Sequence, residues 1–420
     1  MSNSPQLEFL GQGALYASQF DDVYFKENGI EESRHVFIDG VDFEKVKLVM
    51  ETSKGQEKYR IGETGFGTGL NFVLALDAWR QLKIPGILEF YSVEKYPLSS
   101  DQMKNIADER KVLSVINFEW VNSYCQEVDR LSSEKTAIEV FGRDFHLHVE
   151  CGEGGDILNN WCQSSNIQNE SMLKSFDAWF LDGFDPIKNK DLWNYQLFES
   201  IRALSKPGAK MATYTSSGIV KRPLIKNGFV IQKREGVLGK QHVIHGSYDA
   251  NKIIAKLAWQ DYLDKALVGS LQKGAIDESM QLIEEGAKIN KIESYFAAAN
   301  KGVLHKIVTD WLDLDLLMDG QLGLDDRGDS ILHASIRSRK TQEVTFLVNY
   351  FRKANIDPNQ FRDKHGRTAL FLCAHQRDWG LCELLLDLGF DPFIKDRYNK
   401  SISELQRNES HWFELLANKK

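Results

Sequence analysis

The chain has 420 residues, and domains of about 100–200 residues are typical, so we expect two or three domains. Hydrophobic residues make up 42% and charged residues 27% of the sequence, which excludes collagen-like, low-complexity and wholly disordered classes. The formal net charge of −8 excludes a generally basic coat for nucleic acid, but it does not exclude a local basic groove.

The sequence also bears on the compartment. No apolar run approaches the roughly 18–20 residues that span a bilayer, and Met1–Leu10 lacks the basic-then-apolar layout of a signal peptide. The five cysteines form no CxxC pair and are odd in number, so we expect no disulfide framework and no metal site. A reducing, cytoplasmic compartment is favoured, and export into a host cell without a cleaved signal peptide stays open.

Short apolar runs alternate with longer helical patterns between about Lys58 and Tyr248. The alternation predicts a parallel sheet with helices on both faces, and the short connection Glu235–Gly239 predicts an antiparallel hairpin at its edge. Helical patterns include Leu70–Gln81 and Leu192–Leu204. The predicted strands are Lys58–Ile61, Leu88–Val93, Phe145–Glu150, Ala178–Leu181, Lys210–Tyr214, Phe229–Arg234 and His242–Gly246.

A glycine-rich stretch, Gly62-Glu63-Thr64-Gly65-Phe66-Gly67-Thr68-Gly69, follows the first predicted strand and opens a helix. Glycine permits positive φ and lets a ligand approach the backbone, at the turn where doubly wound sheets bind ligands. Leu70 stands where a dinucleotide fingerprint has its third glycine, and no Lys-Ser or Lys-Thr pair follows, so a P-loop is excluded. A purely structural turn is the alternative.

Acidic residues follow three of the later strands. Glu94 closes one of them, where a carboxylate can accept hydrogen bonds from both hydroxyls of a ribose. A glycine loop without a phosphate clamp, joined to such an acid, favours S-adenosylmethionine over a dinucleotide. Glu153 or a backbone amide beside it could reach the adenine, although Asp156 could replace Glu153. Asp182 lies at the carboxyl edge of the sheet, with a helix N-cap or turn residue as the alternative.

After about Ile253 the strand-like runs stop, and pairs of helices punctuated by Gly, Asn and Asp repeat. Gly286 and Gly389 lie in similar stretches about three periods of 33–34 residues apart. Residues 326–332 and 363–370 form a second related pair, with a weaker relative at 396–401. These stretches resemble ankyrin repeats, with a generic helical-hairpin domain as the alternative. We expect domains at 1–252 and 253–420, the second with about four degenerate repeats that bind a protein partner.

Five stretches of the first half match one pattern in order: Phe20–Phe25, Gly62–Phe72, Ser92–Leu98, Trp179–Pro186 and Ala212–Gly218. Together they resemble the methyltransferase part of the bifunctional tRNA wobble-uridine enzyme MnmC over about residues 5–250. The resemblance implies a Rossmann-like class I methyltransferase fold with an antiparallel last strand. It also implies methyl transfer from S-adenosylmethionine to the primary amine of 5-aminomethyl-(2-thio)uridine in tRNA. No FAD is expected, because ankyrin-like repeats occupy the place of the family's oxidase half.

The resemblance assigns roles residue by residue. Asp182 is expected to be the catalytic carboxylate, and residues 20–34 to form a lid over the cofactor, with a solvated acidic strand and loop as the alternative. The cofactor-binding residues are expected to be Glu63, Gly65, Phe66, Gly67, Gly69, Glu94, Glu153 and Asp182. The substrate contacts are expected to be Tyr24, Asp185, Lys221 and Arg222. Lys221 and Arg222, together with Lys240, are expected to contact RNA phosphates.

Departures from the family's pattern concern the substrate. Asp185 stands where the family usually has Ala, Lys240-Gln241-His242 replaces Lys-Arg-Glu, and Glu153 replaces Asp. Residues 1–250 carry a net charge of −7 and residues 251–420 a net charge of −1, so the acidic half is the one expected to bind tRNA. Three hypotheses stay open: a tRNA N-methyltransferase, an effector-like methyltransferase directed by its repeats to a protein or small-molecule amine, and a binding protein whose methyltransferase half is inactive.

Overall fold

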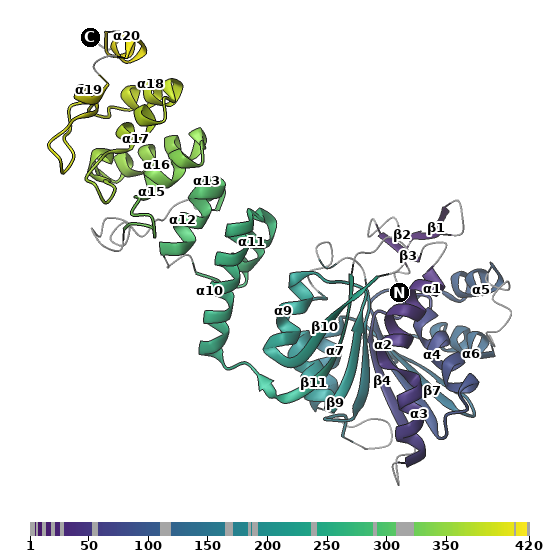
Figure 1. Cartoon of the computed structure of the whole chain (residues 1–420). Coiled ribbons are helices and arrows are strands. Elements are labelled where there is room, and N and C mark those ends of the chain that lie inside the picture. Colours follow the sequence, from purple (N-terminus) through teal and green to yellow (C-terminus); the bar gives the residue numbers. More distant parts are fainter. Residues whose placement is uncertain are drawn as a thin grey trace. The chain divides into compact units, whose positions relative to one another are not determined.

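The computed structural model describes residues 5, 7–10, 14–17, 22–25, 29–52, 58–109, 119–163, 171–183, 186, 192–236, 242–288, 292–307, 323–406 and 409–417. The chain divides into two compact units, Met1–Ala255 and Lys256–Lys420 (Figure 1). Among the described residues, no helix is both long enough and apolar enough to cross a membrane.

The first unit is built on an eight-stranded sheet with the order β10-β11-β9-β8-β4-β5-β7-β6. Its strands are β4 (Lys58–Thr64), β5 (Ile87–Glu94), β6 (Ala137–Phe141), β7 (Phe145–Cys151), β8 (Phe176–Leu181), β9 (Ser205–Thr213), β10 (Asn227–Glu235) and β11 (His242–Ile253). The central strands β9, β8, β4, β5 and β7 are parallel. Strand β6 pairs antiparallel with β7, and β11 pairs antiparallel with both β9 and β10. The predicted α/β fold with an antiparallel hairpin at its edge is confirmed.

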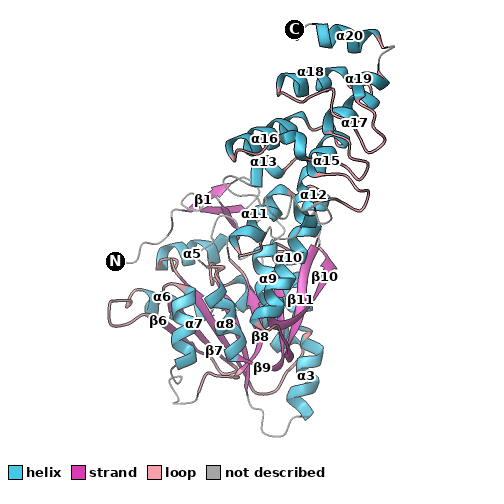
Figure 2. Cartoon of the chain, turned by 90° about the vertical axis from the view of Figure 1, so that its left-hand side faces the viewer, coloured by secondary structure: helices cyan, strands magenta, loops and turns pink. Residues whose placement is uncertain are grey.

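Helices cover both faces of this sheet (Figure 2). The helical segments are α1 (Gly29–Ser33), the π-helix η2 (Arg34–Ile38), α2 (Asp39–Val41), α3 (Phe43–Thr52), α4 (Leu70–Gln81), α5 (Ser100–Glu109), α6 (Glu119–Val128), α7 (Gly154–Gln163), α8 (Tyr195–Leu204) and α9 (Gly218–Lys226). Alternate residues of β8 enter two separate apolar clusters: Phe180 packs with η2, α4 and α6, and Trp179 packs with α7, α8 and α9. Gly62 is required beneath Trp179, because a Cβ there would lie 2.3 Å from the indole ring.

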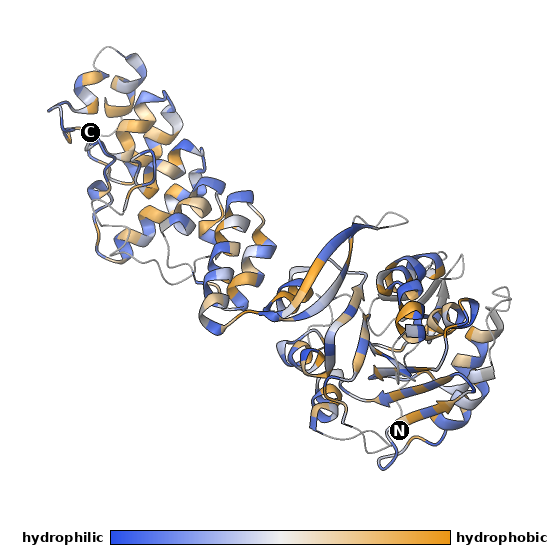
Figure 3. Ribbon diagram, turned by 60° about the horizontal axis from the view of Figure 1, so that its bottom comes forward, coloured by the Kyte–Doolittle hydropathy of each residue, from blue (hydrophilic) through white to orange (hydrophobic). Residues whose placement is uncertain are grey.

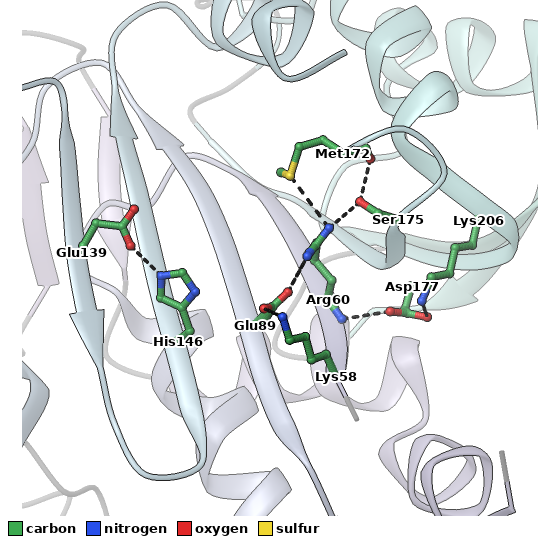
Figure 4. Close-up of polar contacts among 9 residues, drawn as sticks. All are labelled: Lys58, Arg60, Glu89, Glu139, His146, Met172, Ser175, Asp177 and Lys206. Atoms are coloured by element: carbon green, nitrogen blue, oxygen red, sulfur yellow. Dashed lines mark hydrogen bonds and ion pairs between the residues drawn. The ribbon is translucent and has the colours of Figure 1, made fainter. Parts of the chain in front are cut away.

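A buried polar network joins the strands away from their carboxyl ends (Figure 4). Arg60 on β4 is 5% exposed, and its Nη2 and Nε donate to Glu89 Oε2 on β5 at 2.6 and 2.9 Å. Its Nη1 donates to Ser175 Oγ at 2.6 Å, and its backbone N–H donates to Asp177 Oδ2 at 2.9 Å. Lys206 Nζ lies 2.6 Å from Asp177 Oδ1. The network ties β4 to β5 and β8, the strands whose other ends carry the candidate site.

The structure differs from the prediction in a few elements. The sequence analysis missed the short edge strand β6, and also a separate three-stranded sheet of β1 (Leu7–Leu10), β2 (Ala14–Ala17) and β3 (Asp22–Phe25). Helix α8 begins at Tyr195, later than predicted, because Asn194 Oδ1 caps it by accepting the Leu197 N–H at 2.9 Å. Strand β11 continues through residues 249–253, and two residues separate it from the start of α10.

The second unit consists of helices packed pairwise along the chain. They are α10 (Lys256–Lys273), α11 (Ile276–Glu284), α12 (Ile292–Lys301), α13 (Leu304–Ile307), α15 (Ile331–Arg337), α16 (Thr341–Lys353), the 3₁₀ turn η4 (Pro358–Gln360), α17 (Ala369–His375), α18 (Trp379–Asp387), α19 (Ile402–Leu405) and α20 (Ser410–Ala417). Helix α10 packs on α11 and α12, α12 on α15, and α15 on α16 and α17. Orange and blue residues alternate along these helices in Figure 3, as expected for helices that bury one side.

The three related turns of the sequence are copies of one another in the structure. Each begins with an aspartate (Asp325, Asp363 or Asp396) whose Oδ1 accepts the backbone N–H groups two and four residues later, at 2.8–3.0 Å. The fourth residue of each turn is left-handed: Gly328 (φ 78°), Gly366 (φ 74°) and Asn399 (φ 59°). The repeat therefore lies in backbone geometry as well as in sequence.

The helix ends after α11 and α18 repeat in the same way. Gly286 and Gly389 have φ of 99° and 74°, and the residue after each donates its N–H to a carbonyl five residues back, at 2.8 and 3.0 Å. Asn355 ends α16 with φ of 58° and the same hydrogen bond, at 2.8 Å from Ile356 N to Phe351 O. Asn355 therefore belongs to the same series and lies one period before Gly389. A search for glycine alone does not find it.

Candidate active site

The carboxyl ends of β4, β5 and β8 meet at one edge of the sheet. The strand order reverses between β4 and β8, because the chain passes from β4 outward through β5 and β7 and then returns to the other side. Open α/β sheets bind ligands at such a switch point. The glycine loop after β4, Glu94 at the end of β5 and Asp182 directly after β8 all lie at this edge.

The glycine loop adopts a conformation that only glycine adopts readily. Gly65, Gly67 and Gly69 have φ of 103°, 52° and 71°. A Cβ on Gly65 would lie 3.3 Å from Gly183 Cα, so the loop runs close to the turn that carries Asp182. Side chains at these positions would be strained.

Phe66, predicted to bind the cofactor, faces the interior. Its side chain is 3% exposed, and its ring packs against Trp120 and Tyr124 at centroid distances of 6.1 and 5.7 Å. The Phe66 side chain therefore anchors the loop in the core, and only the backbone of Phe66 belongs to the surface of the loop.

Glu94 holds the glycine loop against β5. Its Oε2 accepts the Gly67 N–H at 2.8 Å and its Oε1 accepts the Tyr96 N–H at 2.9 Å. Burial raises the pKa of Glu94 above its usual value, although these backbone hydrogen bonds oppose the shift. Each oxygen keeps a further lone pair, so the carboxylate can also accept hydrogen bonds from a ligand.

Glu63 lies beneath the loop. It is 1% exposed, and its oxygens accept hydrogen bonds from Ser92 Oγ at 2.7 Å and from Asn71 Nδ2 at 2.9 Å. Burial, with the nearby Asp182 charge, raises the pKa of Glu63 well above its usual range. Its predicted contact with the cofactor does not agree with this enclosed position.

Asp182 is half-buried and held from several sides. Its Oδ1 accepts the Gly183 N–H at 2.8 Å, and its Oδ2 accepts a hydrogen from Asn71 Nδ2 at 2.7 Å. Thr64 Oγ1 donates to the Asp182 carbonyl at 2.7 Å, and Tyr214 OH donates to the Gly183 carbonyl at 2.7 Å. Side chains from β4, α4 and the end of β9 thus fix the turn.

Glu153 lies at the neighbouring strand end. Gly152 N donates to the Glu94 carbonyl at 2.9 Å, which brings the end of β7 next to β5. The Glu153 carboxylate is exposed and forms an ion pair with Lys95. It borders the same edge of the sheet, on the far side of Glu94 from Asp182.

The structure describes only some of the residues that were predicted to contact the substrate. Tyr24 belongs to β3, but its side chain lies outside the described residues, as do Asp185 and Lys240. Lys221 is half-buried on α9. Arg222 is 2% exposed, with its guanidinium packed over Gly218 at the start of the same helix, so the predicted contact with an RNA phosphate is wrong for Arg222.

Sequence reasoning missed Asn71, Thr64 and Tyr214 as parts of the site. Thr64 lies inside the glycine-rich stretch, Asn71 lies two residues after it, and Tyr214 follows a predicted strand. Their positions next to strand ends were a usable signal, since the carboxyl ends of adjacent parallel strands converge.

The residues at this edge suit S-adenosylmethionine. Glu94 offers acceptors for ribose hydroxyls. No lysine or arginine lies within residues 61–72, so the loop has no side chain to clamp a phosphate. Among the described residues, no group of three or more His, Cys, Asp or Glu side chains could hold a metal ion.

Comparisons with known proteins agree with this description. Residues 117–249 match a family of S-adenosyl-L-methionine-dependent methyltransferases, and residues 295–396 match ankyrin repeats in 3 copies. The tRNA 5-methylaminomethyl-2-thiouridine biosynthesis bifunctional protein MnmC of Pseudomonas entomophila (strain L48) is 35% identical over 257 residues, which are 60% of this chain and 36% of that protein. Its namesake in Marinomonas sp. (strain MWYL1) is 28% identical over 387 residues, 91% of this chain and 51% of that protein.

A crystal structure of MNMC2 from Aquifex aeolicus is also similar, with 20% identity and a TM-score of 0.42 over 61% of this chain and 74% of that chain. The chain spans about a third to a half of the length of the two bifunctional relatives. It carries an S-adenosyl-L-methionine-dependent methyltransferase domain that resembles the methyltransferase part of MnmC, followed by C-terminal ankyrin repeats.

Proposed function

We propose that the chain transfers the methyl group of S-adenosylmethionine to a primary amine, with Asp182 as the carboxylate beside that amine. The observation that supports this most directly is the placement of Asp182. It stands half-exposed at the switch point of the sheet, and its turn lies beside Gly65 of the glycine loop.

The reaction needs a carboxylate because of the charge of the acceptor. A primary amine near neutral pH is mostly an ammonium group without a free lone pair. Asp182 can bind this cation, accept one proton from it and hold the nitrogen in line for attack. S-adenosylmethionine supplies an electrophilic methyl group, whose bond to sulfur breaks with its electrons on sulfur as the nitrogen–carbon bond forms. The balance is one secondary ammonium product and one released proton.

The cofactor is proposed to lie along the glycine loop. Gly65, Gly67 and Gly69 would border it, and Glu94 would accept hydrogen bonds from its ribose. Glu153, at the next strand end, would lie toward the adenine. Glu63 and the Phe66 side chain would support the loop from beneath and not touch the cofactor.

The acceptor is proposed to be 5-aminomethyl-2-thiouridine in tRNA. The two bifunctional relatives are named for the biosynthesis of 5-methylaminomethyl-2-thiouridine, the product of methylating that amine. The net charge of −7 on residues 1–250 disfavours long-range capture of RNA, so the contacts would be local ones, with Lys221 and Lys240 as candidates.

Exchange of one residue tests the proposal. Asp182→Asn keeps the size of the side chain but cannot accept the proton, so methyl transfer to tRNA carrying 5-aminomethyl-2-thiouridine should fall about 100-fold or more. Binding of S-adenosylhomocysteine, measured by calorimetry, should be retained. Wild-type turnover by the variant would contradict the role of Asp182.

A second candidate function is favoured by the ankyrin repeats. Residues 295–396 match repeats of this kind, and stacked repeats present an extended surface to partners. Phe393 and Tyr398 in the last turns are 66% and 68% exposed. Under this alternative the repeats bind a protein, and the methyltransferase domain acts on a protein or small-molecule amine or is inactive, as in a bacterial effector exported into a host cell. Labelling of protein and not of tRNA would favour it.

A further inference from the structure

Asn71 links two acidic side chains at the site. It is the second residue of α4, directly behind the glycine loop, and it is 5% exposed. Its Nδ2 lies 2.9 Å from Glu63 Oε1 and 2.7 Å from Asp182 Oδ2. An amide nitrogen carries two hydrogens, so each carboxylate can receive one. The opposite orientation would set the amide oxygen against the Asp182 carboxylate at 2.7 Å, which favours the nitrogen at this place.

This arrangement has a cost in stability. Asn71 Oδ1 is buried and has no hydrogen-bond partner among the described residues. A buried acceptor without a donor destabilises a fold, and leucine, which has a similar size, would avoid that cost. Packing alone therefore does not explain asparagine at this position, whereas its two donated hydrogen bonds do.

Glu63 is a fixed anchor for this link. No basic side chain among the described residues forms an ion pair with it, and its other oxygen is held by Ser92 Oγ at 2.7 Å. A side chain so enclosed cannot swing out toward a ligand. The position of Asn71 is therefore set from the interior of the sheet.

We infer that Asn71 is a positioning residue for Asp182, which it joins to the fixed Glu63 carboxylate so that Asp182 meets the acceptor amine in one orientation. The inference rests on the proposed function of Asp182. Gly183 N and Asn71 Nδ2 hold one oxygen of Asp182 each, which fixes the orientation of its carboxylate. An amide donor also leaves the negative charge of Asp182 in place, where a lysine or arginine at position 71 would neutralise it.

Steady-state kinetics of the full chain test this role. With tRNA carrying 5-aminomethyl-2-thiouridine as acceptor, Asn71→Leu should lower kcat about 10- to 100-fold, while KM for S-adenosylmethionine changes less than about threefold. Its melting temperature should fall only modestly, because the loss of the donor to buried Glu63 Oε1 is partly offset by removal of the unpaired Oδ1. Gln81→Leu, at the far end of α4, is the matched control and should behave as wild type. Asn71→Ser, whose hydroxyl has one hydrogen and cannot serve both carboxylates, should lose kcat as well and serves if the leucine variant does not fold.

A binding experiment tests the same role without any acceptor. S-adenosylhomocysteine carries no charge where the methyl group would be, whereas sinefungin carries an ammonium group there. Calorimetry should show that the wild-type chain prefers sinefungin, and that Asn71→Leu reduces this preference about fivefold or more with unchanged affinity for S-adenosylhomocysteine. Wild-type kcat in Asn71→Leu, an unchanged preference, or no preference in the wild type would each overturn the inference. An inactive wild type on tRNA would contradict the proposed acceptor, and calorimetry would then decide the role of Asn71.

Discussion

Three carboxylates at the site differ in what surrounds them. Glu94 and Asp182 are half-exposed and accept backbone N–H groups from the loops beside them, whereas Glu63 is enclosed and accepts only side-chain donors. The two partly buried acids lie at the edge of the sheet, and the enclosed one lies beneath them. These different surroundings are the reason for proposing different roles for the three residues.

Glu94 is the residue whose loss should weaken the cofactor most. Glu94→Ala would remove the acceptor proposed for the ribose and also the hydrogen bond from Gly67 N. We expect a loss of about 2–3 kcal/mol in binding S-adenosylhomocysteine, measured by calorimetry. Glu127→Ala, which removes an acid that pairs with Arg130 and Lys135, is the control and should leave the affinity unchanged. Equal affinities of the Glu94 variant and the wild type would remove Glu94 from the site.

Glu89 should matter for stability and not for binding. Glu89→Ala would leave the Arg60 guanidinium buried without its charge partner, which destabilises a fold by about 3–5 kcal/mol. Glu51→Ala breaks only the exposed pair with Lys47 and should cost less than about 0.5 kcal/mol. Chemical denaturation of both variants measures the difference, and equal effects would contradict the account of this network.

The sequence predicted which residues meet at the candidate site but not the direction of every side chain. The positions of Glu94 and Asp182 were predictable because the carboxyl ends of parallel strands meet at one edge of a sheet. Phe66 and Arg222 were placed wrongly, since burial depends on which neighbours pack over each residue. Asn71 was missed because its importance arises from acids on β4 and after β8, residues that only the fold brings together.

At the scale of elements, the β6–β7 pair contains a charge cluster with a pH dependence. Glu139 lies 2.5 Å from both His146 and His148, and His148 lies 3.0 Å from Glu150. Burial lowers the pKa of His148, but hydrogen bonds to Glu139 and Glu150 outweigh burial and raise the pKa to about 9. Burial raises the pKa of Glu139, but hydrogen bonds to the two histidines lower it to about 2.

The sign of the effect follows from these pKa values. Because the folded pKa of His148 exceeds the unfolded one, its contribution to stability is complete below about pH 6.5 and is lost as pH rises through about 9. We expect the melting temperature of the wild type to fall between pH 6.5 and 9.5 more steeply than that of His148→Gln. The control variant is His411→Gln, on α20. Parallel curves for the wild type and His148→Gln would contradict the prediction.

The repeated turns of the second unit make a matched pair of variants available. Asp363 is 6% exposed, accepts two backbone N–H groups and pairs with Arg367. Asp396 accepts the same two hydrogen bonds but is only partly buried. Asp363→Ala should therefore destabilise the second unit by about 2–4 kcal/mol and Asp396→Ala by about 1 kcal/mol, measured by chemical denaturation. A larger effect at Asp396 would show that the turn geometry does not determine stability.

Sequence reasoning recognised the repeats where glycine marks a left-handed residue. It had no comparable signal at Asn355, because asparagine also occurs in turns, caps and helices. The short strand β6 was missed because a five-residue alternating run next to a tight turn carries less pattern than a fully buried strand.

At the scale of the whole molecule, the two compact units should unfold independently. Each has its own core, divided between Ala255 and Lys256. Differential scanning calorimetry of the full chain should show two transitions, with Glu89→Ala lowering only one and Asp363→Ala only the other. One transition that both variants lower equally would contradict the division.

The central claim is methyl transfer to an amine in tRNA, and one labelling experiment tests it most directly. The full chain and its Asp182→Asn variant are incubated with methyl-labelled S-adenosylmethionine, beside tRNA carrying 5-aminomethyl-2-thiouridine and beside a whole-cell protein extract. We predict label in the tRNA, at the wobble uridine, for the wild type and none for the variant. Label in protein alone, or equal labelling of tRNA by both forms, would contradict the account.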